Sequence, residues 1–401
     1  MKATPTAQAT LPNALTAVLI AQFLSALADN ALLFAAIALI KSQQRPESWI
    51  PLLQEFFVVA FILLAPFAGP LADAFAKGRV MLLANSLKLA GGVAMLGGIH
   101  PLWAYGLVGV GAAAYSPAKY GILSEMVSAD RLVAANGLME GSTIVAILLG
   151  VAAGGWLADI AVPLALWTVL ACYAGAMLAN LFIPNIPAAH TGERFSPSEL
   201  LRGFITSSAL MLKDRDARFS LGCTSLFWGS GATLRLLLVA WVPLALDIHD
   251  TSTPANLNGA VAIGIAGGAA LASAWIRLDT VNRALWPGLL IGPVIMMLAP
   301  AHDLVLAVVF LVTIGLSGGM FVVPLNALLQ ERGHHTVGAG HAIAIQNLFE
   351  NLAMLFMVGL YTFSIDHGVD AAHAAVGFGA IIFIGLTLIG VGRLKLSTRR
   401  S

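Results

Sequence analysis

Long apolar runs with almost no charge dominate this sequence, and they restrict what the chain can fold into more than any other feature. Hydrophobic residues make up 59% of the chain and charged residues only 10%, whereas a soluble domain is about 25% charged. So few charges could not cover a globule of this size against water. The excess apolar surface must therefore face lipid, which predicts an all-α, polytopic membrane protein.

Twelve runs are long enough to cross a bilayer, since a transmembrane helix needs about 20 predominantly apolar residues. We expect spans at 13–40, 51–76, 80–99, 101–124, 137–158, 161–183, 218–246, 255–276, 284–300, 303–328, 339–364 and 372–392. One long polar stretch separates the first six from the last six. The predicted organisation is a six-helix bundle at 1–183, a linker at 184–217 and a second six-helix bundle at 218–401. The first span is expected to be retained rather than cleaved as a signal peptide.

The basic residues indicate the topology. With the N-terminus placed in the cytoplasm, 16 of the 21 Lys and Arg residues fall on cytoplasmic segments, two fall outside and three lie within spans. Cytoplasmic loops of membrane proteins carry the excess of basic residues. Both termini and the linker are therefore predicted to be cytoplasmic.

The two halves also repeat each other. Residues 117–125 read PAKYGILSE, and residues 324–331, about 206 positions later, read PLNALLQE. Each stretch leads through a short loop into another apolar helix. This offset is close to half the chain, so we expect two six-span pseudo-repeats related in parallel, with a substrate site between them.

The loop between the second and third spans carries the sharpest local pattern, GPLADAFAKGR at 69–79. It resembles the signature loop of the major facilitator superfamily. Gly69 would allow close helix approach, Asp73 would hold the N-terminus of a neighbouring helix, and Lys77 or Arg79 would pair with an acid such as Glu125. We predict that these five residues form a conformational gate. The alternative is an ordinary basic cytoplasmic turn.

Charges inside membrane spans are costly and mark candidate functional sites. Asp29, followed by Asn30, lies in the middle of the first span, and Arg235 lies in the middle of the seventh. Adding the repeat offset of 206 to 29 gives 235, so opposite charges occupy equivalent positions. We predict that they bind a charged headgroup. The alternative is a structural salt bridge, and a bridge that opens during transport would satisfy both interpretations.

Other polar residues extend the candidate substrate site. Lys119 follows a proline in the fourth span and could bind a phosphate, or it could snorkel to the cytoplasmic surface. Gln346 and Glu350 share a face of the eleventh span because they are four residues apart, as are Asn347 and Asn351. This stripe would face a cavity or hydrogen-bond between helices. Lys88 is assigned to a position nearer a helix end, with a structural role.

Several classes of function are excluded by what the sequence lacks. There is no Gly-Lys dipeptide and hence no Walker A loop, and no nucleophile, base and orienting group suggest an enzyme. The two cysteines form no metal or redox motif, and a net charge of +1 gives no basic stripe for nucleic acid. We expect no cofactor, no metal and no catalytic residues.

Longer stretches allow a narrower assignment. The segments AQFLSALADNALLF, GPLADAFAKGRV, VGVGAAAYSPAKYGIL and GGMFVVPLNALLQERG closely resemble the bacterial lysophospholipid transporter family of the major facilitator superfamily, and the resemblance runs from about residue 17 to 391. It implies a bacterial inner-membrane flippase that moves lysophosphatidylethanolamine and lysophosphatidylglycerol from the outer to the inner leaflet. It also implies functional coupling to an acyltransferase/acyl-carrier-protein synthetase that reacylates them.

Two alternatives remain open from the residues. The chain could be a proton-coupled multidrug or small-solute carrier with Asp29 as the proton site, or an accessory subunit that docks the acyltransferase. Position 341, where the family motif leads us to expect an amide, is a histidine.

Overall fold

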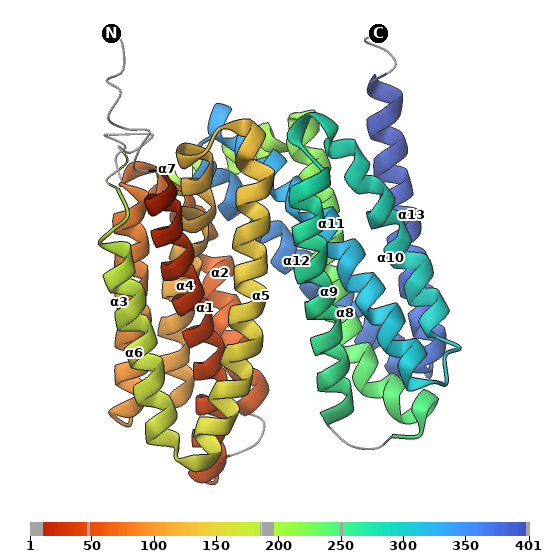
Figure 1. The fold of residues 1–401 in the computed structure, drawn as a ribbon, viewed down its shortest axis with the longest axis horizontal. Helices are drawn as coiled ribbons and strands as arrows, with labels where there is room; N and C mark the ends of the chain where they lie inside the picture. Colours follow the sequence, from red (N-terminus) through yellow and green to blue (C-terminus); the bar gives the residue numbers. More distant parts are fainter. Residues whose placement is uncertain (1–10, 46–48, 185, 187–195, 249–251, 398–401) are drawn as a thin grey trace. The chain divides into compact units, whose positions relative to one another are not determined.

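The computed structural model describes residues 11–45, 49–184, 186, 196–248 and 252–397, and these residues form helices joined by short loops (Figure 1). The α-helices are α1 (Leu11–Ser42), α2 (Trp49–Ala74), α3 (Lys77–Leu96), α4 (Pro101–Met126), α5 (Ala129–Ile160), α6 (Val162–Asn180), α7 (Pro197–Lys213), α8 (Arg215–Leu246), α9 (Ser252–Trp275), α10 (Leu285–Leu298), α11 (Leu304–His335), α12 (Ala339–Asp366) and α13 (Ala371–Ser397). A 3₁₀ helix, η2 (Leu278–Ala284), precedes α10.

Each predicted span corresponds to one long helix, and the predicted all-α polytopic fold is confirmed. Among the described residues, eleven helical segments are long and apolar enough to cross a membrane. The remaining predicted span, 101–124, is α4, which has 26 residues and is therefore about 39 Å long. Its glycines, tyrosines and Lys119 interrupt its apolar sequence. The predicted span at 284–300 is α10 preceded by η2.

One helix was not predicted. The polar linker contains α7, which is amphipathic: Phe204 and Met211 are buried, whereas Leu201 and Ile205 are exposed. An amphipathic helix that exposes apolar side chains but is not apolar enough to span a bilayer is typical of the membrane interface.

The six-helix repeat is confirmed by the helix starts. Adding 206 to the first residue of each of α1–α6 gives a position within four residues of the start of α8, α9, α10, α11, α12 and α13, in that order. The offset found between two short sequence stretches therefore applies along the whole membrane region.

Two compact units are present, and two repeat-related helices contribute to both. The first unit comprises Met1–Ser128, Val145–Leu210 and Gly333–Asn347, and the second comprises Ala129–Ile144, Met211–Arg332 and Leu348–Ser401. The beginning of α5 thus belongs to the second unit, and the beginning of α12 to the first. Because α5 and α12 are equivalent in the repeat, the exchange is reciprocal.

In the first unit, α4 packs against α2 and α3, while α6 packs against α1 and α3. Tyr173 is fully buried in a core that includes Leu32 and Val108. Many other core positions in this unit are alanines, which is characteristic of membrane helices that approach closely through small residues.

In the second unit, α13 packs against α8 and α10, and α8 against α9. The core is built around Trp241 and Phe321. The indole Nε1–H of Trp241 donates to the carbonyl of Ala299 at 3.3 Å, so its one polar group is satisfied as burial requires.

Large apolar side chains cover the outside of both units. Phe182, Trp156 and Leu63 are strongly exposed in the first unit, and Trp286 and Phe356 in the second. Exposed aromatic and aliphatic side chains of this kind are what a lipid-facing surface requires, and a soluble protein would not present so many.

A glycine seam joins α9 to α11. A Cβ added to Gly264 or Gly268 would collide with backbone atoms of α11, and one added to Gly315 or Gly319 would collide with backbone atoms of α9. Gly267, on the same helix, has open space at its Cβ position. The four glycines form two pairs spaced by four residues, which lets the two backbones touch.

We expect Gly268→Ala to lower the thermal unfolding midpoint in detergent, because the added methyl meets the backbone carbonyl of Leu316 and forces the helices apart. Overpacking of this kind costs about 1–3 kcal/mol. Gly267→Ala is the matched control, one residue away on the same helix with no neighbour in reach. Equal midpoints for the two variants would show that the seam does not contribute.

Candidate functional site

Asp73, at the end of α2, binds the beginning of α12 within the first unit. Its Oδ1 accepts the backbone N–H of Gly340 at 2.8 Å, and its Oδ2 accepts that of His341 at 2.9 Å. The first N–H groups of a helix have no partner within the helix, and their partial positive charge favours an anion. The predicted attachment of Asp73 to a helix N-terminus is therefore confirmed.

His341 adds a third bond to the same carboxylate. Its Nδ1 lies 2.8 Å from Asp73 Oδ2, and because a carboxylate oxygen only accepts, Nδ1 carries the proton. The histidine found in place of an amide thus supplies a donor to the carboxylate that caps its own helix.

Lys77 lies buried beside Asp73 and joins it to α4. Only 2% of the residue is exposed, and its Nζ contacts Asp73 Oδ1 at 3.2 Å and Glu125 Oε1 at 2.5 Å. The predicted pairing of Lys77 with Glu125 is therefore present. Arg79, the other predicted partner, is exposed. A buried lysine between two carboxylates meets the requirement that buried charges be paired.

Three glycines make room for this arrangement. A Cβ on Gly69 would lie 2.8 Å from the Cα of His341, and one on Gly340 would lie 2.8 Å from both Ala72 Cβ and Asp73 Oδ1. Gly338 has φ +100°, a conformation that L side chains rarely adopt. The predicted role of Gly69 in close helix approach is borne out by this contact.

We expect Asp73→Ala to accelerate hydrogen exchange at the amides of Gly340 and His341 by about five- to thirtyfold, since losing a capping carboxylate costs about 1–2 kcal/mol. Peptide-level exchange in detergent over residues 338–345 measures this. Asp159→Ala removes an exposed carboxylate from α5 and should leave the same peptide unchanged. Unaltered exchange in Asp73→Ala would contradict the capping role.

A second cluster of polar side chains lies inside the first unit around Asp29. The Nζ of Lys88, on α3, contacts Asp29 Oδ2 at 2.6 Å, and Tyr173, on α6, donates its hydroxyl to Asp29 Oδ1 at 2.8 Å. Lys88 also donates to Ser25 Oγ at 3.0 Å, and Ser25 donates to Asn85 Oδ1 at 2.7 Å. The carboxylate therefore has a cationic partner within its own unit.

The position assigned to Lys88 from the sequence was wrong. It is the twelfth residue of the 20-residue helix α3, not one near its end, and it is 2% exposed. Its Nζ also lies 4.8 Å from the ring centre of Tyr115, a favourable cation–π distance. Asp29 and Lys88 both lie near the middle of their helices α1 and α3, and equal depth in the membrane is the signal that could have paired them.

A double-mutant cycle should show this coupling. We expect Lys88→Met to destabilise the protein by about 3–5 kcal/mol, because it leaves the Asp29 carboxylate without its cation. Asp29→Asn combined with Lys88→Met should recover at least about half of that loss. Apparent unfolding midpoints in one detergent provide the comparison, with the exposed Lys41→Met as control. A double variant as unstable as Lys88→Met would exclude the pair as the cause.

The remaining predicted substrate residues are spread over both units. Asn30 donates to the carbonyl of Ala26 at 2.8 Å. The Nζ of Lys119 lies 4.3 Å from the ring centre of Tyr120. Arg235 lies on α8 in the second unit with an exposed side chain, whereas Asp29 belongs to the first. Their joint binding of a headgroup stays a prediction.

The polar stripe of α12 runs from one unit into the other. Gln346 and Asn347 belong to the first unit, and Asn347 donates to Ser116 Oγ at 3.0 Å. Glu350 and Asn351 belong to the second unit and are buried. The bond to Ser116 shows that interhelical hydrogen bonding accounts for part of this stripe.

In the second unit, the start of α5 binds α11 through two rungs of polar side chains. Asn136 and Gln330 exchange two amide hydrogen bonds, at 2.9 and 2.7 Å. One turn further along, Asn326 donates to Glu140 Oε1 at 3.3 Å. The sequence analysis missed this ladder, although each helix carries polar residues spaced by four, the spacing that places side chains on one face.

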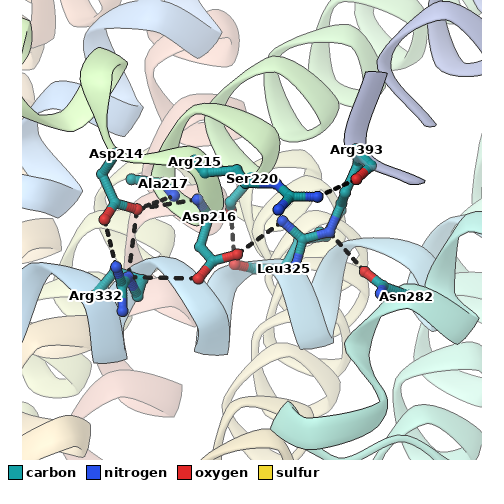
Figure 2. Close-up of polar contacts among 9 residues, drawn as sticks. All are labelled: Asp214, Arg215, Asp216, Ala217, Ser220, Asn282, Leu325, Arg332 and Arg393. Carbon is teal, nitrogen blue, oxygen red and sulfur yellow. Dashed lines mark hydrogen bonds and ion pairs between the residues drawn. The ribbon is translucent and has the colours of Figure 1, made fainter. Parts of the chain in front are cut away.

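The second unit also holds an arginine-rich network where α8 begins, shown in Figure 2. Asp214 caps α8 by accepting the N–H groups of Asp216 and Ala217. Arg332 pairs with both aspartates, and Arg393 Nη1 contacts Asp216 Oδ1 at 2.8 Å. Burial alone would raise the pKa of the Asp214 carboxyl, but the hydrogen bond and charge of Arg332 and the two amide donors hold it below its ordinary value.

Comparisons with known proteins agree with this helical repeat. The family model described as Major Facilitator Superfamily matches residues 18–358. The structure of FucP, a transporter of this superfamily in the outward conformation, superposes with a TM-score of 0.75, 13% identity and coverage of 94% of this chain and 98% of that one. A bacterial homologue of the iron transporter ferroportin in the outward-facing state gives 0.75, 14%, 96% and 99%. At these identities the likeness concerns the fold alone, which is that of a multi-pass membrane transporter.

Much more similar sequences are known. The proteins named Lysophospholipid transporter LplT from Shigella boydii serotype 4 (strain Sb227) and Escherichia coli (strain K12 / DH10B) are 53% and 52% identical over 375 residues, covering 94% of this chain and 94% of each relative. The chain therefore belongs to the Major Facilitator Superfamily and, within it, to the family of these relatives.

Proposed function

We propose that this chain transports lysophospholipids, such as lysophosphatidylethanolamine and lysophosphatidylglycerol, from the outer to the inner leaflet of the bacterial inner membrane. The observation that carries the proposal is the identity of just over half of the residues to lysophospholipid transporters along nearly the whole chain. The membrane-length helices and the buried charges support it.

A lysophospholipid requires a site that handles both charge and hydrocarbon. Its headgroup carries a phosphate and, in lysophosphatidylethanolamine, an ammonium group. The Asp29–Lys88 pair offers one partner for each, because the ammonium can replace Lys88 at Asp29 while Lys88 turns to the phosphate. Exchanging partners in this way keeps every charge neutralised inside the membrane, where an unpaired charge is most costly. Arg235 and Lys119 are the further cations we assign to the phosphate.

The Asp73 cluster supplies the gate in this proposal. The beginning of α12 is held by Asp73 in the first unit, while the rest of α12 belongs to the second unit. A movement of one repeat against the other must therefore break the bonds between Asp73 and α12. Alternating access would cycle through the formation and release of this contact, and Lys77 would keep the Asp73 carboxylate paired when α12 leaves.

The cellular context follows from the same proposal. The lysophospholipid delivered to the inner leaflet would be consumed by an acyltransferase/acyl-carrier-protein synthetase, which draws transport in one direction without a coupled ion. Both termini and α7 would face the cytoplasm, according to the distribution of basic residues.

A second candidate is a proton-coupled carrier, favoured by the partly buried Asp29 carboxylate within the first span. Protonation of Asp29 would release Lys88, and such a charge rearrangement is how a membrane transporter couples to protons. The two candidates differ in their dependence on a proton gradient.

Conversion of labelled lysophosphatidylethanolamine to phosphatidylethanolamine in spheroplasts lacking their own transporter tests the proposal. We expect the parent chain to restore conversion, and Asp29→Asn and Arg235→Gln to lower the initial rate at least about tenfold, since each removes a charged contact worth about 1.5–3 kcal/mol. The exposed Asp370→Asn and Arg45→Gln are charge-matched controls and should behave like the parent.

Three outcomes separate the alternatives. No conversion by the well-expressed parent would overturn lysophospholipid transport. Conversion that collapses when the proton gradient is dissipated would favour the proton-coupled carrier. Full activity of Asp29→Asn and Arg235→Gln would keep the transported substrate but remove these two residues from its site.

A further inference from the structure

A pocket of about 290 Å³ opens between the start of α8 and the end of α13, inside the second unit. Three of its lining residues are arginines, Arg215, Arg218 and Arg393. Figure 2 shows the Arg215 side chain directed toward Arg393, and its Nη2 donates to the Arg393 carbonyl. The volume is close to the lower end of the range of about 300–1,000 Å³ for ligand pockets.

The positive charge of the pocket exceeds what the surrounding aspartates neutralise. Asp216 pairs with Arg393, and Arg332 pairs with Asp214. Within the described part of the chain, Arg215 and Arg218 pair with no carboxylate, and the Nε of Arg215 is buried without a hydrogen-bond partner. Arginines without a carboxylate partner keep their full positive charge, and guanidinium groups bind phosphate well, so Arg215 and Arg218 favour an anionic ligand.

Local helix stability does not explain these arginines. Arg215 and Arg218 lie in the first turn of α8, where the helix dipole disfavours cations. Asp214 already caps the N-terminus of the helix, and Asp216 already places a negative charge in its first turn. Placing two more positive charges there raises the local potential further, which favours the binding of an anion.

The rest of the pocket is apolar. Phe219, Leu388 and Ile389 line it together with Gly222 and Gly392. Arg393 lies over the ring of Phe219, with Cζ 4.1 Å from the ring centre, so its charge is held at the boundary between the basic and the apolar lining. A basic rim above an apolar wall fits a molecule with an anionic head and a hydrocarbon body.

We propose that this pocket binds the phosphate of an anionic phospholipid, such as phosphatidylglycerol or cardiolipin, from the leaflet that faces α7 and the C-terminus. Basic pockets between transmembrane helices on the cytoplasmic side bind such headgroups. The lipid would sit on the outer side of α8 and α13 as a bound partner and not as the transported substrate. Its phosphate would accept from Arg215 and Arg218, and its acyl chain would lie along Leu388 and Ile389.

Native mass spectrometry of the full chain, released from detergent with added cardiolipin or phosphatidylglycerol, tests the proposal. We expect Arg215→Gln and Arg218→Gln each to weaken binding of the anionic lipid about fivefold, since one basic residue near a membrane contributes about 1 kcal/mol. Arg202→Gln removes an exposed arginine of α7 outside the pocket and should leave the affinity unchanged.

A second pair of variants fills the pocket without changing the charge. A Cβ at Gly392 meets no atom within 4 Å, and the same holds for Gly377, further back on α13 and outside the pocket. Gly392→Leu should therefore occupy the pocket and lower lipid binding at least about fivefold, whereas Gly377→Leu should not. Unfolding midpoints verify that both variants are folded.

Each contrary result bears on a particular part of the proposal. Equal losses in Arg202→Gln and Arg218→Gln would mean attraction by surface charge without a site. Competition by millimolar inorganic phosphate would assign the arginines to free phosphate instead of a lipid. Unchanged binding in Gly392→Leu would exclude the pocket. Because the readout is lipid binding by the purified chain, none of these results depends on whether lysophospholipids are transported.

Discussion

The carboxylate of Asp73 holds together parts of the chain that are more than 260 residues apart in sequence. It accepts the first free N–H groups of α12 and the ring N–H of His341 while Lys77 neutralises it from α3. A buried helix N-terminus and a buried lysine each need an acceptor. The Asp73 carboxylate is that acceptor for both α12 and Lys77. The glycines at 69, 338 and 340 are consequences of this single contact, since any side chain there would separate the carboxylate from the helix it caps.

Equivalent helices of the two repeats, α12 and α5, are attached to their units by different interactions. In the first unit, the start of α12 is attached by a charge, Asp73. In the second unit, the equivalent start of α5 is attached mainly by the neutral amide pair of Asn136 and Gln330. The residue equivalent to Asp73 is Asp279, which is exposed and lies 3.7 Å from Arg277, the residue just before η2. The repeat therefore conserves helix positions but not the interactions between them.

The sequence predicts the fold well because membrane-length apolar runs and a repeat offset are properties of local composition. It also predicts that Lys77 or Arg79 pairs with Glu125, since an acid and a base at the ends of neighbouring spans have few other partners, and the structure shows that Lys77 does. The partner of Asp29 was harder to predict because it depends on how α1 and α3 are rotated, which span limits do not fix. The pocket at Arg215 and Arg393 was out of reach, because its two sides are 178 residues apart and neither carries a recognisable motif. The amphipathic helix α7 was not predicted, because the polar residues around it are typical of an irregular linker.

The seam of Gly264, Gly268, Gly315 and Gly319 has a mechanical consequence. Where side chains separate two helices, the helices can slide by changing rotamers, but here backbone meets backbone and no rotamer is available to absorb displacement. When the second unit changes conformation, α9 and α11 must therefore move together as one rigid body. Sliding of helices past one another within the second unit must then occur at the other helix–helix contacts. The amplitude of thermal motion should therefore differ between helices of nearly equal length.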